Sequence, residues 1–144
     1  MKTYDYLLNF GIKPSVQRIA IMDYLLEHLT HPSIDEIYLA LCEKIPTLSK
    51  TTVYNTLKLF VEHGAATMLT IDEKNVCYDA EVRTHAHFLC KKCNKISDLP
   101  LRLEVQTRID KVKAVGFQVD EVHEYFRGIC PACLAKMREE GQLN

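Results

Sequence analysis

The sequence predicts an α+β fold of two units, an N-terminal winged helix-turn-helix followed by a small α/β unit. Up to Gly64, apolar residues recur every three or four positions, which is typical of amphipathic helices. After Gly64, two short runs alternate with a period of two, which is typical of strands. Both C-x-x-C pairs of the chain lie beyond that change. We therefore expect one unit at residues 1–82 and a second at residues 83–144.

Three helices are expected in the first unit, each with its own capping residue. Ser15 can cap the first helix, and Ser33 opens an S-x-x-E capping box before the second. Ser49 or Thr47 can cap the third helix, and Gly64 follows its end. The apolar stripe predicted for the first of these helices comprises Val16, Ile19, Met22, Leu26 and Leu29.

Strands are expected after the third helix. Ala66–Ile71 and Val76–Ala80 predict a hairpin around a turn at residues 72–75, and three helices followed by a hairpin is the order of a winged helix-turn-helix. The second unit is predicted to contain strands at His85–Leu89 and Lys95–Leu99, a helix at Leu101–Val115, an extended segment at Phe117–Ile129 and a short helix at Ala132–Glu140.

The composition excludes several classes of protein. No stretch approaches the roughly 20 apolar residues of a membrane span, and no secretory signal is recognisable, so we expect a cytoplasmic protein. The formal net charge is −1, so composition alone does not indicate a nucleic-acid partner. Six cysteines in a reducing compartment indicate metal or redox chemistry rather than a disulfide scaffold.

Two C-x-x-C pairs predict a structural zinc ion. Each pair lets two sulfurs bind one ion, and two pairs complete a tetrahedral set of four thiolates. Disulfides and a redox dithiol are the alternatives, but neither pair opens a helix within a βαβ unit. Cys42 and Cys77 are expected to be small buried residues. The predicted zinc ligands are Cys90, Cys93, Cys130 and Cys133.

The segment before the first C-x-x-C pair contains a second candidate metal-binding pair. His85 and His87 lie two positions apart on a predicted strand, so their side chains share one face, whereas Cys90 has the opposite parity. Imidazoles with carboxylates suit Fe²⁺, Mn²⁺, Zn²⁺ or Co²⁺. The alternative is that these histidines simply face solvent. Further candidate ligands are His31, Asp79 and Asp98.

Together these features resemble the ferric uptake regulator (Fur) family of bacterial metal-dependent transcription factors over essentially the whole chain. The resemblance is carried by the segments PSVQRIAIMDYL, HPSIDEIYLAL, SKTTVYNTLKLFVEHG, VCYDA, HAHFLCKKCNKISD and CPAC. It implies a homodimer with an N-terminal winged-helix DNA-binding domain, a C-terminal dimerisation domain, a structural Zn²⁺ and a regulatory metal at the domain junction.

The resemblance also assigns ligands and a branch of the family. It places the structural zinc on the four paired cysteines. Aspartate at positions 79 and 98, together with Asn55, resembles the peroxide-sensing PerR branch; iron sensors more often carry Glu and Arg at the corresponding positions. The regulatory Fe²⁺ or Mn²⁺, with Zn²⁺ also possible, is assigned to His31, Asp79, His85, His87 and Asp98.

The third helix is the expected DNA reader. Its N-terminal end would enter the major groove, where Tyr54 can contact a thymine methyl and Asn55 an adenine edge. Lys74 is a further phosphate candidate in the hairpin turn. A solvated helix face is the alternative reading. The predicted DNA contacts are Lys13, Arg18, Lys50, Thr51, Tyr54, Asn55 and Lys58.

We therefore expect a metal-dependent, peroxide-responsive transcriptional repressor rather than an enzyme. Its partners would be a double-stranded DNA operator and a second copy of the chain, with no membrane and no small-molecule substrate. An iron- or zinc-uptake regulator is the alternative within the family. A thiol oxidoreductase, a metallohydrolase and a zinc-stabilised protein-interaction module are the alternatives outside it.

Overall fold

The computed structural model describes residues 2–72, 76–80 and 85–141. The chain divides into two compact units, Met1–Val82 and Arg83–Asn144. Among the described residues, no helix has both the length and the apolar character needed to cross a membrane.

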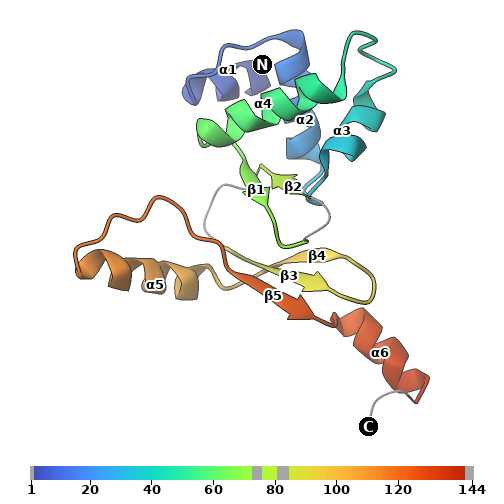
Figure 1. Ribbon diagram of the computed structural model, residues 1–144, viewed down its shortest axis with the longest axis vertical. Coiled ribbons are helices and arrows are strands. Elements are labelled where there is room, and N and C mark those ends of the chain that lie inside the picture. Colours follow the sequence, from blue (N-terminus) through green and yellow to red (C-terminus); the bar gives the residue numbers. More distant parts are fainter. Residues whose placement is uncertain (1, 73–75, 81–84, 142–144) are drawn as a thin grey trace. The chain divides into compact units, whose positions relative to one another are not determined.

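The first unit contains four helices and a two-stranded hairpin (Figure 1, blue to green). The hairpin strands pair antiparallel, with Thr67 opposite Asp79, and the predicted order of helices and then a hairpin is confirmed. The predicted turn at 72–75, with Lys74, lies largely outside the described residues. The elements are α1 (Lys2–Asn9), α2 (Val16–Glu27), α3 (Ile34–Leu41), α4 (Lys50–Glu62), β1 (Thr67–Leu69) and β2 (Cys77–Asp79).

Serine caps begin α2, α3 and α4, as predicted. Ser15 accepts a hydrogen bond from the Arg18 amide at 3.2 Å. Ser33 accepts from Glu36 at 3.2 Å, and Ser49 accepts from Thr52 at 3.1 Å. Each bond satisfies one of the amides that a helix N-terminus leaves without an intrahelical partner. Of the two candidates for α4, the cap is therefore Ser49 and not Thr47.

The apolar stripe predicted for α2 is partly wrong. Val16 and Leu29 are 76% and 55% exposed, and Leu26 is 38% exposed. The buried residues of α2 are Ile21, Met22 and Leu25. This helix carries apolar residues on more than one face, so spacing alone did not identify the face that meets the core.

Helix α1 was not predicted from the sequence. It contributes one fully buried side chain, Leu7, to the core of the first unit. Tyr6 also packs on Phe10, with ring centroids 5.0 Å apart. One buried residue in eight gives little periodic signal. The largest fully buried side chain of this unit is Phe60 on α4.

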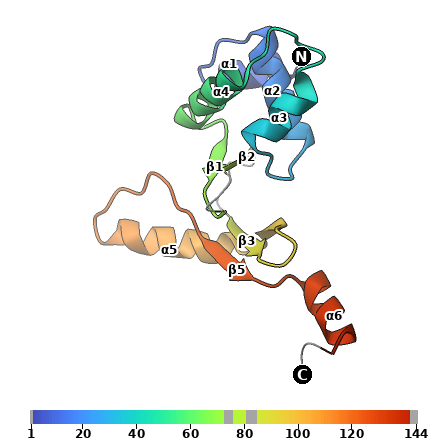
Figure 2. The same cartoon turned by 45° about the vertical axis from the view of Figure 1, so that its right-hand side comes forward.

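The second unit is a three-stranded sheet with order β4-β3-β5 and two helices (Figure 1, yellow to red). Strand β3 pairs antiparallel with β4 and parallel with β5, which leaves β5 at an edge. In both views α6 continues from the end of β5, away from α5 (Figure 2). The elements are β3 (Ala86–Cys90), β4 (Ile96–Leu99), α5 (Arg102–Ala114), β5 (Tyr125–Gly128) and α6 (Pro131–Glu139).

The core of the second unit is small. It consists of Ala86, Val105 and Ile109, with Leu99, Leu101 and Val119 packed partly against it. Val112, three positions after the buried Ile109 on α5, is 44% exposed. The predicted extended run from Phe117 to Ile129 forms a strand only at β5. The core of this unit therefore buries little apolar surface.

Candidate metal centres and nucleic-acid surface

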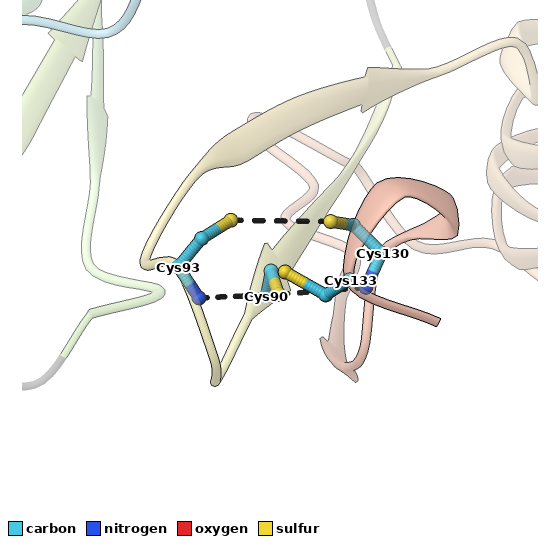
Figure 3. Close-up of side chains that lie close together, drawn as sticks. All are labelled: Cys90, Cys93, Cys130 and Cys133. Carbon is cyan, nitrogen blue, oxygen red and sulfur yellow. Dashed lines mark hydrogen bonds between the residues drawn. The ribbon is translucent and has the colours of Figure 1, made fainter. Parts of the chain in front are cut away.

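The four paired cysteines come together in the second unit (Figure 3). Cys90 ends β3, Cys93 lies in the turn that follows, and Cys130 and Cys133 lie at the start of α6. The four sulfur atoms all lie within 4.8 Å of one another, and those of Cys93 and Cys130 are 3.9 Å apart. A tetrahedral zinc with Zn–S bonds of 2.3 Å separates its sulfurs by about 3.8 Å. The spacing therefore fits one ion.

Backbone amides prepare one of these sulfurs for metal binding. The amides of Cys93 and Cys130 donate to the Cys90 sulfur at 3.5 and 3.4 Å. These bonds lower the pKa of Cys90 from 9.0 to about 6, because they stabilise the thiolate. A hydrogen bond with Cys130, together with desolvation, raises the pKa of Cys133 to about 12. Without a cation, one cluster cannot hold several thiolates, and a divalent ion removes that obstacle.

The remaining two cysteines lie in the first unit. Cys77 is buried on β2. Desolvation, followed by the charges of Glu36 and Asp72, raises its pKa to about 11, so it remains a thiol at neutral pH. Cys42 is half-buried at the end of α3, where its sulfur approaches the Leu39 carbonyl at 3.7 Å. The environment of Cys77 is therefore not that of a reactive thiolate.

In the first unit, His31 and Asp79 form a buried pair. The His31 Nε2 atom lies 3.5 Å from Asp79 Oδ2, and the two residues are 5% and 1% exposed. The Tyr78 amide donates to the Pro32 carbonyl at 2.9 Å, so the loop that carries His31 is fixed against β2. A bridge between Ser33 and Cys77 fixes the next residues in the same way.

The backbone of His31 is unusual. Its φ angle is +62°, in the left-handed region that residues other than glycine rarely adopt. Such a conformation costs of order 1–3 kcal/mol and is concentrated at functional sites. The surrounding hairpin contacts hold it in place, and the imidazole is consequently directed to Asp79 rather than to solvent. A loop histidine beside a proline would ordinarily be exposed.

In the second unit, two histidines converge on one carboxylate. His85 immediately precedes β3 and His87 lies within it, and each Nε2 atom is 3.2 Å from the same oxygen of Asp98. The antiparallel register places His87 directly opposite Asp98 on β4. The shared face that i and i+2 spacing predicted is confirmed by ring centroids 4.3 Å apart.

The two His–Asp groups, His31 with Asp79 and His85 and His87 with Asp98, both have the spacing of metal ligands. Ligand bonds of about 2.1 Å set neighbouring ligand atoms roughly 3.0–3.4 Å apart in octahedral or tetrahedral geometry. The observed separations of 3.2 and 3.5 Å are close to this range. Imidazole and carboxylate are the donors that Fe²⁺, Mn²⁺ and Zn²⁺ accept. Each group therefore has donor atoms and spacing that suit a metal ion: His31 with Asp79 in the first unit, and His85 and His87 with Asp98 in the second.

Helix α4 presents the predicted DNA-reading residues to solvent. Its inward face consists of Val53, Thr56, Leu57 and Phe60. A groove of about 590 Å³ runs between α4 and the start of α2, lined by Lys13, Arg18 and Asn55 among others. The exposed positions on α4 include Lys50, Thr51, Tyr54, Asn55 and Lys58.

Two residues of this groove were missed by sequence reasoning. Gln17 and Thr52 line it beside the predicted contacts. Gln17 also approaches the Thr47 hydroxyl at 3.4 Å, and Arg18 donates to the Lys13 carbonyl at 2.8 Å. Thr52 lies three positions before Asn55, so helical spacing could have identified it.

Comparison with known proteins places the chain in one family. The model described as "Ferric uptake regulator family" matches residues 9–126. The peroxide-responsive repressor PerR of Staphylococcus epidermidis is 36% identical over 137 residues, which cover 94% of this chain and 87% of that protein. The peroxide operon regulator of Bacillus subtilis is 36% identical over 134 residues, which cover 92% and 91%.

Solved structures agree with the sequence relatives. The Campylobacter jejuni peroxide stress regulator matches with a TM-score of 0.70 and 26% identity, covering 90% of this chain and 94% of that chain. The resemblance stated from the sequence is thus confirmed at the level of both sequence and fold. This chain belongs to the ferric uptake regulator family.

Proposed function

We propose that this protein is a metal-dependent, peroxide-responsive transcriptional repressor that binds double-stranded DNA as a homodimer in the cytoplasm. The observation that carries the proposal is the presence of two kinds of candidate metal ligands in one chain. Four sulfur atoms lie together in one cluster, and imidazoles lie against carboxylates elsewhere. A thiolate set favours tight, permanent binding, whereas nitrogen and oxygen ligands favour exchange.

The sulfur cluster is proposed to hold a structural Zn²⁺. Helix α6 has no buried residue, yet its first turn carries two of the four sulfurs. An ion bound by Cys90, Cys93, Cys130 and Cys133 would join α6 to the end of β3. This role needs no open coordination position, which also argues against a hydrolytic zinc.

The histidine and aspartate groups are proposed to share one regulatory ion. His31 and Asp79 come from the DNA-binding domain, residues 1–82, and His85, His87 and Asp98 from the dimerisation domain, residues 83–144. An ion with ligands in both domains binds best when the domains adopt one arrangement. Fe²⁺ or Mn²⁺, or alternatively Zn²⁺, would then stabilise the DNA-competent dimer through that difference in affinity.

The DNA surface is proposed to be the exposed side of α4 together with the groove beside it. Tyr54 and Asn55 would contact base edges, and Lys13, Arg18 and Lys58 would contact phosphates. Thr51 is also exposed, in the first turn of α4. Lys50, at the start of α4, instead pairs with an acidic residue of α3, Asp35.

The edge strand β5 is the proposed contact surface of the homodimer. Its outer side has no neighbour among the described strands of the sheet. Exposed apolar residues accompany it, including Phe117, Val122 and Phe126, which are 67%, 39% and 41% exposed. A second copy would cover such residues and pair the strand edge.

Peroxide sensing is proposed to occur at the regulatory ligands. Fe²⁺ held by His31, Asp79, His85, His87 and Asp98 would supply the electrons needed to cleave peroxide. His31, His85 and His87 lie against carboxylates that would hold the ion, so imidazoles would lie close to an oxidant formed there. An imidazole that gains an oxygen atom is a weaker metal donor. The regulatory ion would then bind less tightly, and the DNA-competent arrangement would no longer be stabilised.

The test compares protein loaded with Fe²⁺ and protein loaded with Mn²⁺. Each sample is treated with peroxide, assayed for binding to promoter DNA, and digested for mass spectrometry. We expect the Fe²⁺ sample alone to lose DNA binding and to gain the mass of one oxygen on a peptide containing His31, His85 or His87. If the Fe²⁺ sample binds DNA unchanged and unoxidised, the protein is an iron- or zinc-uptake regulator instead. Loss of binding through cysteine oxidation alone would instead indicate thiol chemistry.

A further inference from the structure

The first residue of α4 carries a positive charge in an unfavourable place. Lys50 opens the helix, and the first turn of α4 contains no acidic residue. A helix N-terminus has a partial positive charge, so a cation there is destabilising unless an anion lies nearby. The position of the Lys50 ammonium group should therefore depend on the nearest acidic side chain.

That anion comes from the preceding helix, α3. The Lys50 Nζ atom lies 3.2 Å from Asp35 Oδ1 and 5.8 Å from the centre of the Tyr38 ring. Asp35 itself lies in the first turn of α3, where a negative charge is favourable. The ammonium is thus directed towards α3 by an ion pair and by a cation–π contact, both from the same helix.

We propose that Asp35 lowers the sequence-independent DNA affinity of this protein by keeping Lys50 away from phosphates. The proposal rests on the proposed DNA binding. A lysine at the start of a reading helix can contact the phosphates of any sequence, and such contacts strengthen non-operator binding as well as operator binding. Pairing with Asp35 removes this sequence-independent contact. In this proposal Lys50 is not a DNA contact, as the sequence predicted, but links α4 to α3 within the helix-turn-helix.

The pair is exposed, which sets the size of the effect. Lys50 and Asp35 side chains are 59% and 70% exposed. Exposed ion pairs contribute about 0.2–1 kcal/mol, so releasing Lys50 changes affinity by about 1.5- to fivefold. The dependence of DNA affinity on salt is a more sensitive measurement. One added phosphate contact steepens the slope of log affinity against log salt concentration by about 0.9.

Asp35 could also act by repelling DNA directly, and a double-mutant cycle separates the two effects. The variants are Asp35→Asn, Lys50→Gln and the double substitution. Glu36→Gln is the matched control, because Glu36 is the neighbouring acid of the same turn and approaches the Ser33 hydroxyl instead. Full-length, metal-loaded protein is titrated with two duplexes of equal length. One duplex is selected from a random pool for tight binding, and the other is its scrambled sequence.

We expect Asp35→Asn to tighten binding to both duplexes by about 1.5- to fivefold and to steepen both salt slopes by about 0.9. In the Lys50→Gln background the same substitution should have no effect, and Glu36→Gln should not steepen the slope. Two results would overturn the proposal. One is an Asp35→Asn effect that persists without Lys50; the other is a slope that Lys50→Gln alone makes shallower by about 0.9.

A second measurement tests the pair without DNA. Acylation of lysines with acetic anhydride, followed by mass spectrometry, should modify Lys50 faster in Asp35→Asn than in the wild-type protein. Lys58, further along α4, should react equally in both. Equal Lys50 rates would overturn the proposal. Wild-type protein that binds neither duplex would overturn the proposed function itself, whereas bound duplexes with an unchanged Asp35→Asn variant would overturn only the role of Asp35.

Discussion

His87 on β3 lies directly opposite Asp98 on β4, with Nε2 and Oδ1 3.2 Å apart, and His85 reaches the same carboxylate oxygen at the same distance. One side-chain oxygen thus organises two imidazoles. Asp98 is 44% exposed, whereas the two histidine side chains are 10% and 6% exposed. The carboxylate is therefore the most accessible of the three side chains to an entering cation.

Replacing Asp98 by Asn should weaken Mn²⁺ binding by roughly tenfold or more, because a neutral amide replaces the shared negative oxygen. Zinc content should not change, since the sulfur cluster is untouched. Asp110→Asn is the matched control, as Asp110 lies exposed on α5 and accepts from Gln106. Mn²⁺ titration followed by electron paramagnetic resonance gives the affinity. Equal affinities in the two variants would contradict the assignment of Asp98.

Replacing His31 by Asn should abolish metal-dependent DNA binding without unfolding the protein. Asparagine tolerates a φ of +62°, so the substitution removes the imidazole while the backbone keeps its conformation. His28→Asn is the control, because His28 is exposed and stacks on Tyr24. DNA binding is measured with and without added Mn²⁺. A His31→Asn protein that still responds to the metal would exclude His31 as a ligand.

Replacing Cys93 by Ser should remove the zinc and release α6. The helix has no buried residue, so its backbone amides should then exchange with solvent far faster. Cys42→Ser should leave both zinc content and exchange unchanged, since Cys42 lies in the first unit. Elemental analysis and hydrogen–deuterium exchange of residues 131–139 provide the two readings. Retained protection without zinc would show that other contacts hold α6.

Two aromatic residues of α4 should separate stability from DNA binding. Phe60 is fully buried, so Phe60→Ala should lower the free energy of unfolding by about 3–5 kcal/mol. Tyr54 is 47% exposed, so Tyr54→Ala should change that free energy by less than about 0.5 kcal/mol. DNA affinity of Tyr54→Ala should nevertheless fall. Denaturant titration and DNA titration of the full chain measure both, and unchanged affinity would remove Tyr54 from the interface.

The sequence predicted those features that depend on short-range rules. The caps at Ser15, Ser33 and Ser49 follow from local hydrogen bonding, and each occurs where predicted. The shared face of His85 and His87 follows from strand geometry alone. Neither required knowledge of how distant segments pack.

Features that depend on tertiary contacts were not predicted. Helix α1 was missed because Leu7 is its one fully buried residue. The face of α2 was misjudged because Val16 and Leu26 satisfy the helical spacing but are exposed. The partner of Lys50 lies on another helix, so its sequence context suggested a phosphate contact and gave no sign of Asp35.

The left-handed backbone at His31 limits which substitutions this position can accept. Apart from glycine, the side chains that tolerate such a conformation best are Asn, Asp and His. All three carry an atom able to donate electrons to a cation. A substitution that this backbone accepts therefore leaves the fold intact and changes only the donor atom offered to a cation, so the position separates coordination chemistry from stability.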